Sequence, residues 1–100
     1  DIHRHIVSMT IVGLLPGQQT NRHRHTYETV LFVIEGKGWT EVEDEKVYWE
    51  AGDAVYIPSW AWHKHQNLSD TDPAKYIACE NAPQLQNLGV ALREEEGRDL

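Results

Sequence analysis

The stretch from His23 to Gly36 constrains the fold most, because it joins a pair of histidines to an apolar strand pattern. It reads His-Arg-His-Thr-Tyr-Glu-Thr-Val-Leu-Phe-Val-Ile-Glu-Gly. Side chains alternate between the two faces of a β-strand, so His23 and His25 are predicted to point the same way. Two imidazoles held side by side on a sheet can chelate one divalent metal. Two solvated surface histidines are the alternative interpretation of the pair.

The strand predicted over Tyr27–Glu35 is apolar on both faces. Leu31 and Val33 share the face of the histidines, and the opposite face carries Val30, Phe32 and Ile34. A strand that is apolar on both sides needs cover on both sides. One face fits the interior of a sandwich or barrel, and the other needs a second sheet or a second subunit. The pattern therefore predicts a homodimer.

Short strand patterns separated by turn residues fill most of the remaining chain. They are predicted over Ile6–Leu15, Trp39–Glu43, Lys46–Glu50, Ala54–Ile57, Trp60–Gln66 and Lys75–Glu80. Asn81 and Pro83 predict the start of one short helix over 81–89, and the acidic tail 90–100 is expected to be mobile or loosely packed. Many short strands and one short C-terminal helix indicate an all-β fold, a small antiparallel β-barrel or jelly roll.

Length, charge and cysteine content limit the function classes. One hundred residues predict a single domain over 1–100, and the start at Asp1 instead of Met is compatible with an upstream part of unstated length. The net charge of -7 argues against nucleic acid or an anionic membrane surface as partner. No apolar run approaches the ~18 residues of a membrane span. The single cysteine, Cys79, excludes an intramolecular disulfide and fits a cytoplasmic protein.

A second stretch, Gly52–Asn67, follows fifteen residues after Gly36 and holds a further histidine pair. Together the two stretches resemble the cupin family. Its first motif, Gly, five residues and His-x-His, with a closing Gly, is matched by Gly17, His23, His25 and Gly36. Its second motif is matched by Gly52, Pro58, His63 and Asn67. The resemblance implies the cupin barrel, a double-stranded β-helix, with a metal site.

The chain departs from the general cupin pattern at two positions. Thr29 stands where the family has a glutamate ligand, and Trp60 stands where it has glycine. Glu28 lies one residue early, so alternation points it away from the metal unless a β-bulge brings it back. The runs H-R-H-T, F-V-I-E-G and P-S-W-A-W-H-K-H resemble gentisate and 1-hydroxy-2-naphthoate dioxygenases. That resemblance implies Fe(II) held by three histidines, and ring cleavage with O₂.

The resemblance assigns the metal to His23, His25 and His63. Three neutral imidazoles leave the ion its full +2 charge, which suits an anionic chelating ligand. Fe(II) is the implied metal, and Zn, Mn or Ni also fit histidine donors. His65 shares the parity of His63 and is a candidate catalytic base or substrate contact; a histidine bonded to backbone or water is the alternative. Tyr27 is a second catalytic candidate, and the predicted pocket residues are Tyr27, Thr29, Trp60 and Trp62.

Three functions follow from these residues. The first is an Fe(II)-dependent dioxygenase for a small hydroxylated aromatic or keto acid. The second is a non-catalytic or sensory module that binds a metal or a small ligand. The third is a Mn- or Zn-dependent cupin isomerase or decarboxylase, because the same fold carries many activities. In each case two partners are predicted: a small anionic molecule and a second copy of the chain.

Overall fold

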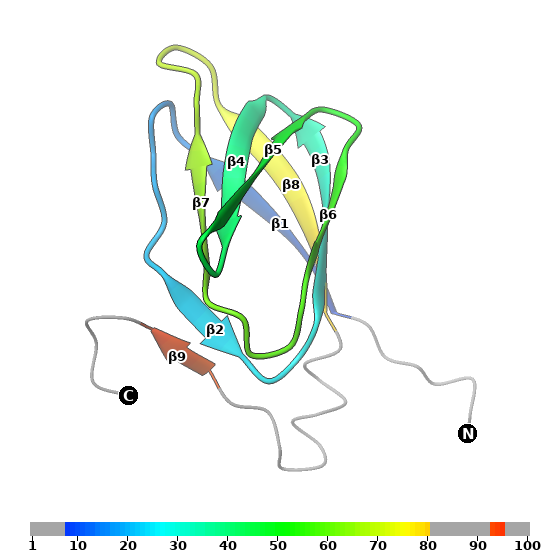
Figure 1. The fold of residues 1–100 in the computed structure, drawn as a ribbon. Coiled ribbons are helices and arrows are strands. Elements are labelled where there is room, and N and C mark those ends of the chain that lie inside the picture. Colours follow the sequence, from blue (N-terminus) through cyan, green and yellow to red (C-terminus); the bar gives the residue numbers. More distant parts are fainter. Residues whose placement is uncertain (1–7, 81–92, 96–100) are drawn as a thin grey trace.

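The computed structural model describes residues 8–80 and 93–95, which form two antiparallel β-sheets that face each other (Figure 1). One sheet has the strand order β1-β8-β3-β6 and the other β5-β4-β7-β2-β9. The strand bounds are β1 Ser8–Leu14, β2 His23–His25, β3 Thr29–Glu35, β4 Lys37–Val42, β5 Glu45–Glu50, β6 Ala54–Ile57, β7 His63–Asn67, β8 Ala74–Glu80 and β9 Arg93–Glu95. The all-β jelly-roll prediction is confirmed. The helix expected over 81–89 lies outside the described residues.

The inner faces of the two sheets differ in character. The first sheet turns apolar side chains inward: Leu31 of β3 pairs with Ala78 of β8 and Val55 of β6, and all three are buried. The second sheet adds Trp49 to this core but otherwise presents buried polar side chains, namely His25, Thr40, His63, His65 and Asn67. The interior is therefore apolar on one side and polar on the other, so a polar site lies against a rigid apolar wall. Within the described residues, no helix has the length and hydropathy that crossing a membrane requires.

Two strands begin later in the sequence than predicted. The strand expected over Tyr27–Glu35 begins only at Thr29, because residues 26–28 turn and carry the chain from β2 in one sheet to β3 in the other. The strand expected from Trp60 begins only at His63. Trp60 adopts a φ of 62° and its N–H donates to the carbonyl of His25 at 2.7 Å, which fixes the turn before β7 against the end of β2.

Of the acidic tail 90–100, which was predicted to be mobile or loosely packed, the structure describes residues 93–95. These residues form β9, which pairs antiparallel with β2 and extends the second sheet, with His23 opposite Glu95 and His25 opposite Arg93. The strand that carries two of the histidines is thus paired on both sides, by β7 and by β9. Pairing on both sides holds β2 in place within the sheet.

Two glycines allow neighbouring segments of the chain to approach closely. Gly36 has a φ of 89°, and a Cβ there would lie 2.8 Å from Cα of Ala74. Gly38 lies in β4, where a Cβ would collide with the backbone carbonyl of Gln66 and come within 2.5 Å of Cη2 of Trp49. Both positions therefore require a residue without a side chain. This accounts physically for the glycine that closes the first motif.

Asn67, the last residue of the second motif, ties three segments together. Its side chain is fully buried and its Nδ2 donates to the carbonyls of Leu14, Leu15 and Asp72. Its Oδ1 accepts from the N–H of Ser69 at 2.9 Å. A buried amide with these partners is fully satisfied and holds the ends of β1 and β7 at a fixed distance.

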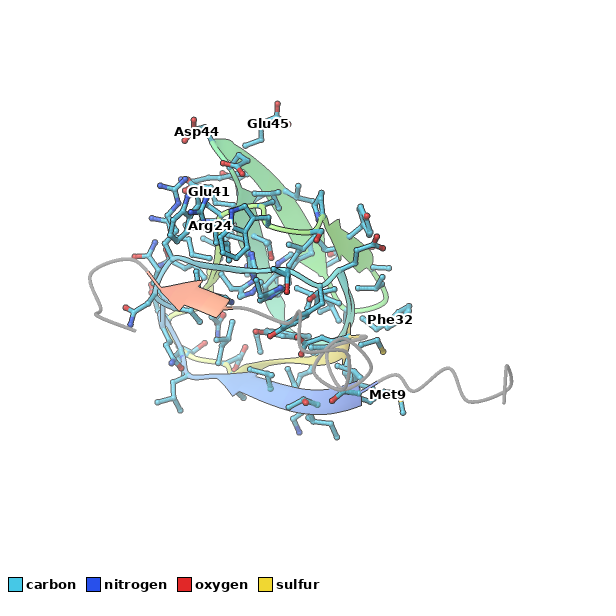
Figure 2. All side chains as sticks on the ribbon, turned by 90° about the horizontal axis from the view of Figure 1, so that it is seen from below. Met9, Arg24, Phe32, Glu41, Asp44 and Glu45 are labelled. Carbon is cyan, nitrogen blue, oxygen red and sulfur yellow. The ribbon has the colours of Figure 1, made fainter. Side chains whose placement is uncertain are left out.

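The outer face of the β1-β8-β3-β6 sheet is exposed and apolar. Ile11 pairs with Ile77 and Ile77 pairs with Phe32, so one row of apolar side chains crosses three strands. Figure 2 shows Met9 and Phe32 at the outside of the molecule. We call this surface the outer apolar face and define it by its large exposed side chains, Met9, Ile11, Phe32, Ile34 and Tyr56. β3 is thus apolar on both faces, as predicted, and no described residue covers its outer face.

Candidate metal centre

Three histidines from two neighbouring strands converge in the interior. His23 and His25 come from β2, and His63 comes from β7 directly opposite His23. The ring centroids lie 4.1 Å apart for His23 and His63, 4.9 Å for His25 and His63, and 5.8 Å for His23 and His25. One ring nitrogen from each lies within 4.8 Å of the other two. Nitrogens at such separations can share a single divalent ion.

The main chain sets which ring nitrogen of each histidine carries the proton. The Nδ1 atoms of His23, His25 and His63 lie 3.0, 2.9 and 2.9 Å from backbone carbonyl oxygens, those of Asn21, Tyr27 and Ala61 respectively. A carbonyl oxygen only accepts hydrogen bonds, so each Nδ1 carries the proton and donates it. Each Nε2 then keeps its lone pair for a ligand. This is the arrangement that orients histidine ligands in metal proteins, and the donor set fits a divalent metal.

Burial keeps His63 uncharged. The pKa of His63 is lowered to about 2, first by burial and then by His23, while its bond to the Ala61 carbonyl acts in the opposite direction. His65 and His25 lower the pKa of His63 further. A metal displaces a proton from a histidine only where one is bound, so neutral imidazoles bind metal without that competition. His63 is therefore uncharged at neutral pH and can offer its Nε2 lone pair to a metal.

Among the described residues, no acidic side chain joins the three histidines as a further possible metal ligand. Glu28 is exposed and accepts a hydrogen bond from Tyr56 on the outer apolar face; desolvation and this carboxylate together raise the pKa of Tyr56. Thr29, at the position of the glutamate ligand in the resembled motif, is buried instead and lines the interior cavity. Its hydroxyl has no hydrogen-bond partner in the structure. The alternation of side chains along the chain accounts for both placements.

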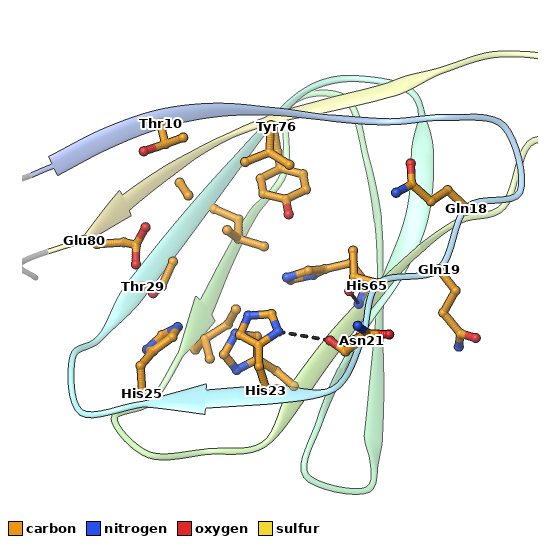
Figure 3. A pocket seen from close by; sticks show the side chains of 16 residues that line it. Thr10, Gln18, Gln19, Asn21, His23, His25, Thr29, His65, Tyr76 and Glu80 are labelled. Atoms are coloured by element: carbon orange, nitrogen blue, oxygen red, sulfur yellow. Dashed lines mark hydrogen bonds between the residues drawn. The ribbon is translucent and has the colours of Figure 1, made fainter. Parts of the chain in front are cut away.

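A cavity of about 580 Å³ opens beside the three histidines (Figure 3). Its apolar wall includes Leu31, Ile57 and Ala78, and its polar wall includes His65 and Tyr76. Gln18, Gln19, Thr20 and Asn21 line the side formed by the loop before β2. Among the described lining residues there is one carboxylate, Glu80, and no lysine or arginine. The described residues therefore bring no permanent cation into the cavity.

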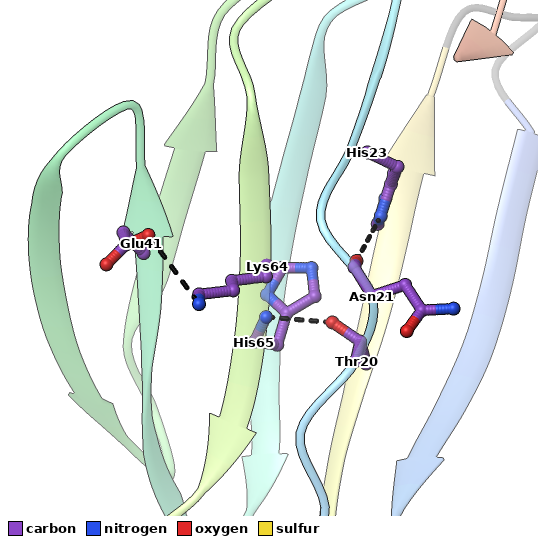
Figure 4. A network of polar contacts seen from close by, with 6 residues as sticks. All are labelled: Thr20, Asn21, His23, Glu41, Lys64 and His65. Carbon is purple, nitrogen blue, oxygen red and sulfur yellow. Dashed lines mark hydrogen bonds and ion pairs between the residues drawn. The ribbon is translucent and has the colours of Figure 1, made fainter. Parts of the chain in front are cut away.

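His65 lines the same cavity but stands apart from the three-histidine cluster. It is 3% exposed, and its pKa is lowered to about 3 by burial and by His23 and His25. Its backbone N–H donates to Oγ1 of Thr20 at 2.9 Å (Figure 4). The neighbouring Lys64 points the other way, towards Glu41 at 4.0 Å. β7 thus directs its histidines inward and its lysine outward.

Three of the predicted pocket residues do not line the cavity. The Tyr27 ring stacks on that of His25 at 3.9 Å with an interplanar angle of 1°, so it supports the His25 imidazole. The guanidinium carbon of Arg24 lies 4.2 Å from the ring centroid of Trp60 and 4.4 Å from that of Trp62. Trp60 and Trp62 occupy even positions, whereas His63 and His65 occupy odd ones. The two tryptophans therefore lie with Arg24, on the side of the sheet away from the three histidines. Of the predicted pocket residues, only Thr29 lies on the cavity wall.

Comparison with known proteins identifies the fold family. A model of the cupin domain matches residues 10–79, which include both histidine pairs of the site. The 5-aminosalicylate 1,2-dioxygenase of Comamonas sp is 40% identical over 77 residues, 77% of this chain and 20% of that protein. The gentisate 1,2-dioxygenase 1 of Aquipseudomonas alcaligenes is 34% identical over 88 residues, 87% of this chain and 25% of that protein.

A solved structure gives the same result. The crystal structure of a salicylate 1,2-dioxygenase from Pseudaminobacter salicylatoxidans superposes with a TM-score of 0.85 at 30% identity, covering 92% of this chain and 26% of that one. The chain therefore spans about a quarter or less of the length of these relatives. Because the cupin match extends over more than half of the sequence and over both motifs, the chain belongs to the cupin family.

Proposed function

We propose that this cupin binds Fe(II) through His23, His25 and His63 and acts in the oxidative ring cleavage of a small hydroxylated aromatic acid. The observation that carries the proposal is the convergence of three imidazoles, which no carboxylate of the described residues joins. Its relatives named as dioxygenases for gentisate and 5-aminosalicylate support the choice of substrate class. When bound, Fe(II) supplies open coordination positions for a chelating acid and for O₂.

The cavity supports an anionic substrate only together with the metal. Its described lining has no lysine or arginine, and it includes the carboxylate of Glu80. A negatively charged acid in such a cavity would lose its hydration without gaining a protein cation, which is unfavourable. A divalent ion held by three neutral ligands keeps both of its charges and compensates the acid. The side-chain amides of Gln18, Gln19 and Asn21 are hydrogen-bonding groups for the carboxylate or hydroxyl oxygens (Figure 3).

The test of this function is oxygen uptake by the metal-loaded chain. The protein is loaded anaerobically with Fe(II), and oxygen consumption is recorded with gentisate, 5-aminosalicylate and salicylate. We expect uptake with at least one acid, and none with the metal-free protein or with the zinc-loaded protein. An iron-loaded protein that binds these acids without consuming oxygen would contradict the catalytic part and favour a non-catalytic ligand-binding module. Activity with Mn or Ni but not with Fe(II) would contradict the metal assignment.

We also propose that two copies associate through the outer apolar face. Five large apolar side chains are exposed there, with fractional exposures from 47% for Ile34 to 71% for Met9. Contiguous exposed apolar surface of this kind marks an interaction site. The chain carries a net charge of -7, so two copies repel each other wherever charged faces meet. A sheet face with a central row of apolar side chains is where two such copies can approach with least repulsion.

The double variant Ile11→Glu with Phe32→Glu tests the dimer. It places two carboxylates per copy in the centre of the outer apolar face, and we expect it to convert the dimer to a monomer in sedimentation velocity. Val47→Glu is the matched control, because Val47 is 42% exposed on β5 of the other sheet. We expect that control to remain dimeric. A monomeric unmodified chain at the same concentration would contradict the proposal.

A further inference from the structure

Behind the cavity, three buried side chains form a hydrogen-bonded chain that ends on His65. Nε1–H of Trp49 donates to Oγ1 of Thr40 at 2.9 Å, and the same oxygen lies 2.8 Å from Nδ1 of His65. The exposed fractions of Trp49, Thr40 and His65 are 3%, 0% and 3%. Thr40 of β4 is directly opposite His65 of β7 in the sheet. The contact is therefore fixed by strand register and not by a loop.

The number of protons available decides the direction of the second hydrogen bond. The Thr40 hydroxyl has one proton, and its oxygen already accepts from the indole of Trp49. The remaining partner that the structure gives this hydroxyl is Nδ1 of His65. If the hydroxyl donates to Nδ1, the oxygen and the proton of the Thr40 hydroxyl and the Nδ1 of His65 all have partners. If Nδ1 carried a proton and donated instead, the hydroxyl proton would be buried without an acceptor, which is costly.

His65 is therefore protonated on the other ring nitrogen from the three histidines of the cluster. Their Nδ1 atoms donate to carbonyls and leave Nε2 as a lone pair, whereas its Nδ1 accepts and leaves the proton on Nε2. Its ring reaches into the cavity, as Figure 3 shows, with Nδ1 turned back towards Thr40. An Nε2 that carries a proton has no lone pair for a metal. The four imidazoles thus divide into three acceptors and one donor.

We propose that Thr40 and Trp49 are positioning residues that hold His65 as a fixed Nε2–H donor for an oxygen atom of the anionic ligand. This rests on the proposed function for the ligand, but the tautomer does not depend on it. His65 then acts neither as a base nor as a fourth metal ligand. A donor beside the three-histidine cluster favours acids that place a carboxylate or phenolate oxygen there, because a hydrogen bond to a charged acceptor is the stronger kind.

The tautomer is read directly by nitrogen NMR of metal-free protein with ¹⁵N-labelled histidine, at a pH above 7. We expect the unmodified chain to show a protonated Nε2 on His65 and a protonated Nδ1 on His23, His25 and His63. Thr40→Val has nearly the same shape without the hydroxyl and should release His65 into a mixture of tautomers. Thr40→Ser keeps the hydroxyl and should restore the original pattern. A protonated Nδ1 on His65 of the unmodified chain would overturn the proposal even if a variant failed to fold.

Ligand binding is measured on the zinc-loaded protein with salicylate as the probe, since zinc does not react with oxygen. Thr40→Val should weaken salicylate binding by about fivefold, the effect of one ordinary hydrogen bond, while the zinc content stays at the value of the unmodified chain. Unchanged salicylate affinity with an altered tautomer would overturn the donor role of His65. An unmodified chain that binds no zinc would instead contradict the proposed metal site and leave the tautomer result standing.

Discussion

His63→Ala is expected to lose most of the bound divalent metal, whereas Glu28→Ala is expected to retain it. His63 contributes one of three ring nitrogens that lie within 4.8 Å of one another. Removal of a residue that merely supports a metal ligand weakens binding about 10- to 100-fold, so loss of a ligand itself should exceed about 100-fold. Metal content after dialysis and titration calorimetry with Zn(II) measure the two effects.

Glu28→Ala is the matched control because its carboxylate is the alternative fourth ligand. Glu28 is exposed and bonds to Tyr56 on the outer apolar face, so its removal leaves the interior unchanged. A β-bulge that turned Glu28 inward would make both variants lose metal equally. Equal losses would therefore contradict the three-histidine site and the charge argument that depends on it.

Gly38→Ala is expected to destabilise the fold by about 3 kcal/mol, at the upper end of the range for overpacking a buried site. The added methyl group would collide with the carbonyl of Gln66 in the neighbouring strand and approach Cη2 of Trp49 to 2.5 Å. Neither neighbour can move freely, because Gln66 belongs to β7 and the Trp49 indole is buried and bonded to Thr40. Urea denaturation followed by tryptophan fluorescence gives the change in the free energy of unfolding.

Gly13→Ala provides the comparison for this effect. Gly13 lies in β1, and a Cβ at that position would meet no atom within 4 Å. Its replacement should change the free energy of unfolding by no more than about 0.5 kcal/mol, as for an ordinary surface substitution. A Gly38→Ala protein as stable as Gly13→Ala would show that β4 and β7 can separate at that point without loss.

Much of the site follows from local alternation in the sequence. The spacing of His23 and His25 predicts a shared face, and the second motif predicts that His63 and His65 share one, as the structure has them. The same alternation predicts that Arg24 and Glu28 turn away from the ligands. The same alternation, applied to residues 60–65, also places Trp60 and Trp62 on the opposite face from His63 and His65. The prediction of a tryptophan-walled pocket was based on the chemistry of the side chains instead and did not use their parity.

Other parts depend on contacts between distant residues that local pattern does not report. β2 and β3 are separate strands because the chain changes sheets at residues 26–28. The pattern of apolar residues alone does not distinguish such a turn from a continuous strand. The pairing of β9 with β2 joins segments about seventy positions apart. Thr40 and Trp49 were not singled out in the sequence, because a threonine and a tryptophan in a hairpin are ordinary strand residues. Only the register of β4 against β7 places Thr40 beside a histidine.

The carbonyl partners of the three histidines have a consequence for how the site can vary. Each of these oxygens belongs to a residue two positions away along the chain, and it is an atom that every amino acid possesses. Exchange of the side chains at positions 21 or 61 therefore leaves the orientation of the His23 and His63 imidazoles unchanged, provided the backbone follows the same path. A non-aromatic residue at position 27 keeps the carbonyl partner of His25 but loses the stacking on its ring. The surroundings of the metal can thus diverge widely among descendants of one ancestor while the donor atoms keep their orientation.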